Sequence, residues 1–180
     1  DEFVVLYAGA LGQANDIDTL LRAAERLKVE EKIRFVLFGD GKERARLQSE
    51  AERRALRNVI FAGVRAKKDM PRVVASADAC LAILQDIPMF RTTYPNKVFD
   101  YMAAGRATIL VIDGVSRRLI EESGGGVYVQ PGDDESLAET VLGLSREPGR
   151  VQQMGKSARE HLVRHLDRCD KLNETLDLLL

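Results

Sequence analysis

The amino-acid sequence predicts a doubly wound α/β domain built on a parallel sheet. Short β-rich runs alternate along the chain with stretches of helical periodicity, an order typical of parallel strands joined by right-handed crossovers. Most of the short runs are continuously apolar rather than alternating, which indicates strands that helices cover on both faces. A length of 180 residues with 45% apolar residues suits one domain with a substantial core.

Six segments have the pattern of buried strands. They are residues 3–7, 33–38, 59–61, 79–84, 108–112 and 126–129. Between them apolar residues recur at helical spacing, and either Asp16 or Asp18 is expected to cap the first helix. The expected helices cover residues 17–27, 42–55, 68–75, 95–104, 116–123 and 135–145.

The tail over residues 148–180 has no further strand pattern and is expected to form one or two helices ending in the apolar segment 176–180. Those terminal leucines need cover, either from this domain's own sheet or from a partner. We expect residues 1–180 to form a single domain with this helical tail. Because a strand pattern begins as early as residue 3, we also expect the chain to be part of a longer protein.

Composition narrows the classes of function. A formal charge of −1 gives no overall attraction for nucleic acid or anionic lipid, so any anion site has to be local. Cys80 lies in an apolar run and is expected to be a buried, reduced thiol, as in proteins of a reducing compartment. Neither the cysteines nor His161 and His165 have further ligands at metal-binding spacing, so no metal site is expected.

No apolar stretch reaches the ~20 residues that span a bilayer, and the first residues lack a signal-peptide pattern; the expected location is the cytoplasm.

Ligands of open parallel sheets bind at the carboxyl ends of the strands, so the loops there are candidate sites. The first loop carries Gly9 and Gly12. Glycines at this place let backbone N–H groups approach a phosphate, and they are equally typical of a plain tight turn. The second loop carries Gly39 and Gly41 but fails as a dinucleotide-binding fingerprint, because Arg44 stands where a small residue is required.

A later helix start has the features of an anion site. Pro95 suits the first position of a helix, which would make Thr93 or Tyr94 the N-cap residue. Asn96 and Lys97 then fall in the first turn, where unpaired N–H groups and the helix dipole favour an anion. A lysine in that position is electrostatically unfavourable unless an anion offsets it. The pattern therefore favours a bound phosphate.

Asp100 lies about one helical turn beyond Lys97 and near the same face. Its carboxylate could accept both hydrogen bonds from a ribose diol. It could equally form an ion pair with Lys97, because residues three apart on a helix are neighbours. The sequence leaves both interpretations open.

Residues 94–105, Tyr-Pro-Asn-Lys-Val-Phe-Asp-Tyr-Met-Ala-Ala-Gly, resemble the signature helix of group 1 glycosyltransferases, retaining enzymes of the GT-B fold. An ordered set of weaker similarities accompanies this helix, in residues 7–12, 17–21, 36–41, 59–63, 77–78 and 124–133. The resemblance implies a Rossmann-like domain that forms the C-terminal, donor-binding half of a GT-B enzyme. The acceptor-binding N-terminal half would be absent from this chain.

The resemblance also implies roles for residues at the strand ends. The loop at Gly9 and Gly12 would approach the donor diphosphate, Val64 and Arg65 would border the nucleobase, and Asp100 would hold the ribose hydroxyls. The residues expected to bind the nucleotide sugar are Gly9, Gly12, Gly39, Gly41, Val64, Arg65, Arg91, Tyr94, Asn96, Lys97 and Asp100.

Three positions depart from the family pattern. Ala10 and Asn15 stand where the family often has an arginine and a lysine that neutralise the diphosphate, and Thr92 stands where the family has an acidic residue. We therefore expect Lys97, with help from Arg91, to supply much of the missing positive charge.

The implied reaction is sugar transfer from a nucleoside diphosphate, with retention of configuration and without a metal or cofactor. Similarity to family members that build bacterial surface polysaccharides favours a UDP-sugar, with an N-acetylated hexosamine as one candidate, and a saccharide or lipid-linked acceptor. No catalytic residue is predicted in this half. The isolated chain is expected to bind nucleotide weakly and to transfer no sugar. A complete enzyme is compatible with a peripheral position at the inner membrane.

Two other classes of protein stay open: half of a GT-B epimerase or phosphorylase, and a non-catalytic or nicotinamide-binding Rossmann domain.

Overall fold

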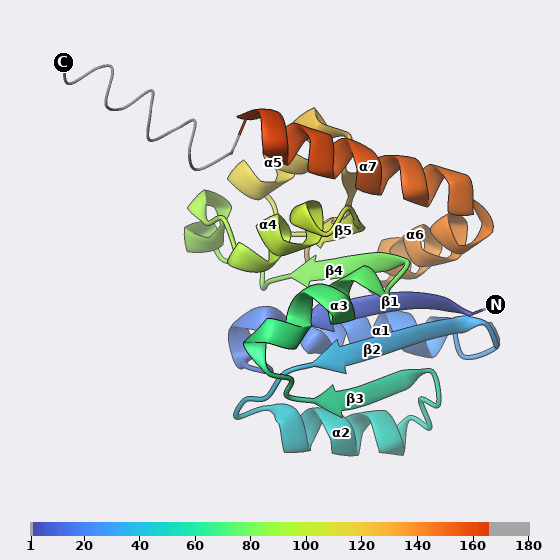
Figure 1. Ribbon diagram of the computed structural model, residues 1–180. Coiled ribbons are helices and arrows are strands. Elements are labelled where there is room, and N and C mark those ends of the chain that lie inside the picture. The colour runs from blue at the N-terminus through green and yellow to red at the C-terminus, as the bar shows by residue number, and fades with distance from the viewer. Residues whose placement is uncertain (1, 166–180) are drawn as a thin grey trace.

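The computed structural model describes residues 2–165 and contains a six-stranded sheet in the order β3-β2-β1-β4-β5-β6 (Figure 1). All neighbouring strands pair in parallel, which confirms the predicted doubly wound sheet. The order switches direction at β1, which has β2 on one side and β4 on the other. The strands are β1 (Phe3–Ala8), β2 (Ile33–Phe38), β3 (Val59–Gly63), β4 (Ala79–Ile83), β5 (Ala107–Val111) and β6 (Gly126–Tyr128).

The predicted helices are present, with ends that differ by a few residues. They are α1 (Ile17–Arg26), α2 (Arg44–Arg53), α3 (Met70–Ala75), α4 (Asn96–Ala103), α5 (Val115–Ser123), α6 (Asp134–Arg146) and, in the tail, α7 (Pro148–His165). The sequence pattern did not predict three short 3₁₀ segments, which are η1 (Gln13–Asn15), η2 (Lys67–Asp69) and η3 (Pro88–Thr92). The segment 176–180 and the second cysteine, Cys169, lie outside the described residues.

The start of α4 differs in detail from the expectation. The helix begins at Asn96, and Pro95 occupies the N-cap position with an extended backbone. Thr93 and Tyr94 are therefore not the N-cap: the φ of Pro95, −66°, would suit a helix, but its ψ of 130° is extended, so the helix starts one residue later. Asn96 and Lys97 still lie in the first turn.

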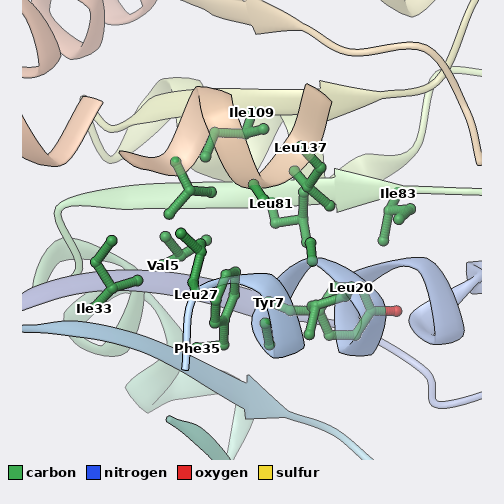
Figure 2. Packing of buried hydrophobic residues seen from close by; sticks show 14 of the residues in the cluster. Val5, Tyr7, Leu20, Leu27, Ile33, Phe35, Leu81, Ile83, Ile109 and Leu137 are labelled. Carbon is green, nitrogen blue, oxygen red and sulfur yellow. The ribbon is translucent and has the colours of Figure 1, made fainter. Parts of the chain in front are cut away.

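Helices cover both faces of the sheet, as the continuous apolar strands predict. Side chains that alternate along β1 separate into two layers: Tyr7 packs with α1, α2 and α6, whereas Leu6 packs with α3, α4, α5 and α7. Figure 2 shows part of the first layer, in which Phe35 and Leu81 from the strands and Leu20 of α1 belong to one cluster of buried side chains. Cys80 is a buried free thiol in the second layer, as expected.

Helix α7 crosses the end of α4 where two glycines meet. A Cβ atom on Gly155 would collide with the carbonyl oxygen of Gly105, so the two backbones touch directly. Ala158, one turn later, is fully buried in the second layer. Small residues in the sequence therefore hold α7 against the domain. The next residue of α7, Arg159, lies beside the end of α4.

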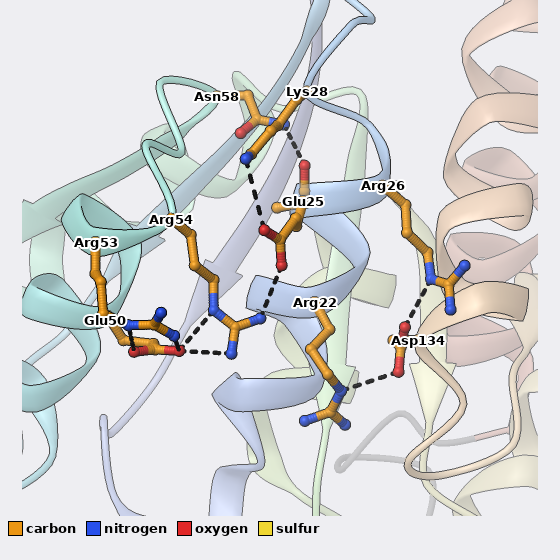
Figure 3. A network of polar contacts seen from close by, with 10 residues as sticks. Arg22, Glu25, Arg26, Lys28, Glu50, Arg53, Arg54, Asn58 and Asp134 are labelled. Carbon is orange, nitrogen blue, oxygen red and sulfur yellow. Dashed lines mark hydrogen bonds and ion pairs between the residues drawn. The ribbon is translucent and has the colours of Figure 1, made fainter.

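Ion pairs tie together the helices of the opposite face (Figure 3). Arg54, directly after α2, pairs with Glu25 of α1 at 3.0 Å, and Asp134 of α6 accepts from Arg22 at 2.9 Å and from Arg26 at 2.7 Å. Partly exposed pairs of this kind each contribute little stability. These arginines are nevertheless paired with carboxylates, far from the carboxyl ends of the strands. The positive charge available to a ligand at the strand ends therefore comes from other residues.

Candidate binding cleft

A cleft of about 710 Å³ opens at the carboxyl ends of β1 and β2, between α3 and α4. This place lies beside the switch in strand order, where open parallel sheets bind their ligands. Of the residues that the sequence predicted for nucleotide-sugar binding, the cleft is lined by Gly9, Gly39, Val64, Arg65, Lys97 and Asp100.

The two glycine loops pack backbone against backbone at the mouth of the cleft. The N–H of Gly9 donates to the carbonyl of Phe38 at 3.0 Å. Gly39 has a φ of +145°, and a Cβ there would collide with the carbonyl oxygen of Gly9, so no other residue fits at position 39 without strain. Within residues 2–165, the N–H groups of Ala10 and Gly12 have no hydrogen-bond partner. Of these two donors, Ala10 lines the cleft, so the first loop offers the N–H of Ala10, rather than that of Gly9, to an anion there.

Lys97 places its ammonium over the first loop instead of beside Asp100. Its Nζ donates to Tyr7 Oη at 3.2 Å and to Asn15 Oδ1 at 3.3 Å, and it lies 4.3 Å from the centre of the Tyr7 ring. Gly9 makes this possible, because a Cβ there would lie 2.6 Å from Nζ. Burial lowers the pKa of Lys97 to about 8. In the described part of the chain Lys97 forms no ion pair, so the alternative of a pair with Asp100 is not what the structure shows.

Two tyrosines that the sequence reasoning missed hold the end of β1. Tyr7 Oη donates to the carbonyl of Ala10 at 2.7 Å. Tyr101 Oη accepts from the N–H of Ala8 at 3.0 Å and lies 3.3 Å from the carbonyl of Leu81. Burial raises the pKa of both phenols, so both remain neutral at ordinary pH.

The side walls of the cleft come from α3 and α4. Asp100 is exposed and lines the cleft one turn after Lys97. Met70 and Val74 of α3 give an apolar wall opposite. Arg159 closes the far end, because α7 crosses α4 there. The sequence reasoning missed the α3 and α7 contributions, since neither follows a strand end.

The loop after β3 forms the outer edge of the cleft. Val64 is 64% exposed, an unusual position for a large apolar side chain. The guanidinium of Arg65 lies 5.9 Å from the centre of the Phe38 ring. Lys67 lines the same edge. This edge therefore combines an uncovered apolar group with two cations.

Two of the predicted binding residues lie on η3, or just after it, and do not line the cleft. Arg91 pairs with Asp86 at 3.1 Å, and this carboxylate raises the pKa of the guanidinium. Tyr94 is 50% exposed. The hydroxyl of Thr92 donates to the carbonyl of Met89 at 3.0 Å. The positive charge of Arg91 is thus already matched, and the cleft depends on Lys97 for charge at this end.

Three further predicted residues also lie outside the lining of the cleft. Gly12 borders a smaller depression of about 270 Å³ on the α1 and α2 side. Gly41 packs so closely that a Cβ would collide with the carbonyl oxygen of Leu11, which makes its role one of loop packing. Asn96 is exposed at the first position of α4.

Possible metal ligands do not gather in the described part of the chain. No three His, Cys, Asp or Glu side chains come together there. His161 and His165 lie next to each other on α7, with ring centres 4.7 Å apart and the rings tilted by 48°. Among residues 2–165, no helix is both long and apolar enough to cross a membrane.

A cleft of this kind, with glycine loops and a largely covered lysine at a strand-order switch, is typical of the ligand sites of doubly wound α/β domains. Comparison with known proteins gives the family: residues 2–147 match the family described as "Glycosyl transferases group 1", and the chain belongs to it. It is 27% identical over 177 residues to the putative colanic acid biosynthesis glycosyl transferase WcaI of Escherichia coli. That match covers 97% of this chain but only 42% of WcaI.

Two solved structures show the same fold. Anabaena HepE, crystallised with UDP, is 20% identical, with a TM-score of 0.85 over 98% of this chain and 49% of HepE. The C-terminal domain of the group 1 protein LpcC from Francisella tularensis is 14% identical, with a TM-score of 0.74 over 91% of this chain and 85% of that domain. The chain thus has the fold of a GT-B C-terminal domain, as the resemblance implied.

Proposed function

We propose that this chain is the donor-binding half of a retaining glycosyltransferase that uses a UDP-sugar without a metal ion. The observation that carries the proposal is the cleft itself. Lys97 and the glycine loops meet at one end of it, and Asp100 lines it one helical turn further on. Family membership supports sugar transfer, and HepE, a relative in fold, has been crystallised with UDP and with UDP-glucose.

The diphosphate would lie at the mouth of the cleft. The Lys97 ammonium, the N–H group of Ala10 and the first turn of α4 all supply positive potential there. As the bond to the sugar breaks, negative charge grows on the leaving diphosphate, and fixed donors of this kind stabilise it. Lys97 would thus contribute to binding and also to the transition state.

The nucleoside would extend along α4 from this point. Asp100 would accept hydrogen bonds from the ribose diol, because its exposed carboxylate follows Lys97 by one turn on the cleft face. The base would then lie between the α3 wall and the outer edge at Val64 and Arg65. An apolar wall suits the face of a base, and the edge leaves its polar groups accessible.

The acceptor would bind to residues outside this chain. The chain spans 42% of WcaI and 49% of HepE, so we propose that an N-terminal half completes the GT-B cleft and brings the catalytic residues. The name of WcaI makes polysaccharide synthesis the favoured setting, with a saccharide or lipid-linked saccharide as acceptor. Such an enzyme would work in the cytoplasm, with peripheral contact to the inner membrane where its acceptor is lipid-linked.

Thermal unfolding of the 180-residue chain with UDP, GDP or NAD separates the candidate functions, because a ligand of the folded state stabilises it by mass action. We expect UDP to raise the melting temperature, with little effect from NAD. A shift with NAD alone would instead support a nicotinamide-binding domain, and no shift with any nucleotide would refute a donor site. We expect no sugar transfer by this chain alone; measurable turnover would contradict the assignment of catalysis to a second half.

A further inference from the structure

The ammonium of Lys97 belongs to α4 by sequence but rests on the first loop. Its Nζ lies 3.3 Å from Asn15 Oδ1 and 3.2 Å from Tyr7 Oη. The missing side chain of Gly9 leaves the space that the ammonium occupies, since a Cβ there would be 2.6 Å from Nζ. Three residues of the first strand and loop therefore define one point for a positive charge.

Asn15 is held firmly enough to act as the acceptor at this point. It closes the 3₁₀ turn η1, where its N–H donates to the carbonyl of Gly12 at 3.0 Å. Its Oδ1 accepts from Lys97, while its Nδ2 forms no hydrogen bond within residues 2–165. An amide oriented in this way holds the ammonium with one atom and offers the other as a donor to an anion.

Tyr7 supports the same point from below. It is fully buried, and its hydroxyl hydrogen is already committed to the carbonyl of Ala10 at 2.7 Å. Its oxygen can therefore only accept from Lys97, and the ring face lies 4.3 Å from Nζ. Both contacts favour a cation.

We infer that the cleft requires a cation at this point above Gly9, that Asn15 and Tyr7 are positioning residues for it, and that a lysine at position 15 can supply the charge in place of Lys97. The inference rests on the proposed function, in which this charge binds the donor diphosphate. The exchange is geometrically reasonable because the end of Asn15 already contacts the ammonium, and lysine has a longer, flexible stem. With both lysines present, the two ammonium groups would repel each other.

Calorimetric titration of the 180-residue chain with UDP tests the inference. Lys97→Met is expected to weaken binding at least about tenfold, the typical effect of losing a charge-assisted hydrogen bond. Adding Asn15→Lys to Lys97→Met is expected to recover most of that loss. Asn15→Ala alone should weaken binding about threefold to tenfold. Lys32→Met, on an exposed lysine at the opposite end of the strands, is the matched control and should bind as the unchanged chain does.

The outcomes distinguish a failure of the proposed function from a failure of the inference about Asn15 and Tyr7. If the unchanged chain does not bind UDP, the proposed function is wrong. If it does bind UDP but Lys97→Met binds UDP as tightly, the inference that the cleft requires a cation at this point is wrong. If Lys97→Met weakens binding but the double variant gains nothing and Asn15→Ala has no effect, only the positioning inference is wrong. Should the double variant not fold, Asn15→Asp decides: its carboxylate would neutralise the ammonium, and binding no weaker than in Asn15→Ala would overturn the inference.

Discussion

Replacing Lys97 by methionine should stabilise the fold while weakening nucleotide binding. Burial lowers the pKa of this lysine from the ordinary 10.5 to about 8. At about 1.36 kcal/mol per pKa unit, the buried ammonium costs the folded state roughly 3 kcal/mol at neutral pH. The lost hydrogen bonds to Tyr7 and Asn15, at about 1 kcal/mol each, offset part of the gain. We expect Lys97→Met to raise the free energy of unfolding by roughly 1 kcal/mol at pH 7.

The dependence on pH identifies the cause. Below about pH 8 the lysine is charged in both states, so the full cost is present. Between pH 8 and 10.5 the folded state releases the proton first while the unfolded state retains it, so the stability of the unchanged protein rises with pH. Relative to Lys97→Met, the unchanged protein should gain roughly 2 kcal/mol between pH 7 and pH 9.5.

Urea unfolding of both proteins at pH 7 and pH 9.5 measures this difference. Groups other than Lys97 that titrate in this range are common to both proteins and cancel in the comparison. Two results would refute the conclusion that the charge of Lys97 destabilises the fold. One is a Lys97→Met variant that is less stable than the unchanged protein at pH 7; the other is a difference in unfolding free energy between the two proteins that does not change with pH.

Three further changes test other parts of the structure. Gly39→Ala should cost at least about 1–3 kcal/mol of stability in urea unfolding, because its Cβ would meet the loop backbone, whereas Gly149→Ala, with open space around it, should be nearly neutral. Asp100→Asn should weaken UDP binding about tenfold in a calorimetric titration but scarcely affect the binding of 2′,3′-dideoxy-UDP, which has neither ribose hydroxyl; equal losses would argue against a ribose contact. Gly155→Val should lower the melting temperature by several degrees, since α7 must move away from α4, and an unchanged melting temperature would contradict the close crossing.

The sequence was sufficient to predict all six strands and their parallel pairing, though not their order in the sheet, because continuous apolar runs such as that of β4 leave few alternatives. It was weaker for the cleft. Tyr7 reads as one more buried residue of a strand, and only the fold reveals its hydroxyl beneath Lys97. Arg159 enters through the crossing of α7, which depends on a contact between glycines about 50 residues apart in sequence.

The charge of Arg91 could not be judged from sequence for a different reason. The 3₁₀ turn η3 brings its partner Asp86 close to it. Short turns of this kind have no apolar periodicity from which they could be predicted. The roles that remain predictions, such as the ribose contact of Asp100, concern a ligand and not the fold.

The walls of the cleft differ in how strongly they are anchored. Helix α3 has only six residues and buries only Val74 completely, whereas α4 buries Val98, Tyr101 and Met102. Displacing α3 therefore exposes less apolar surface than displacing α4, and α3 is the wall that local opening should release first. Backbone amides of α3 should exchange with solvent faster than those of α4, and a bound nucleotide that contacts both helices should slow the exchange most in α3. The cleft would then have one fixed side, α4, that sets the position of the phosphates, and one adjustable side, α3, that closes on the base.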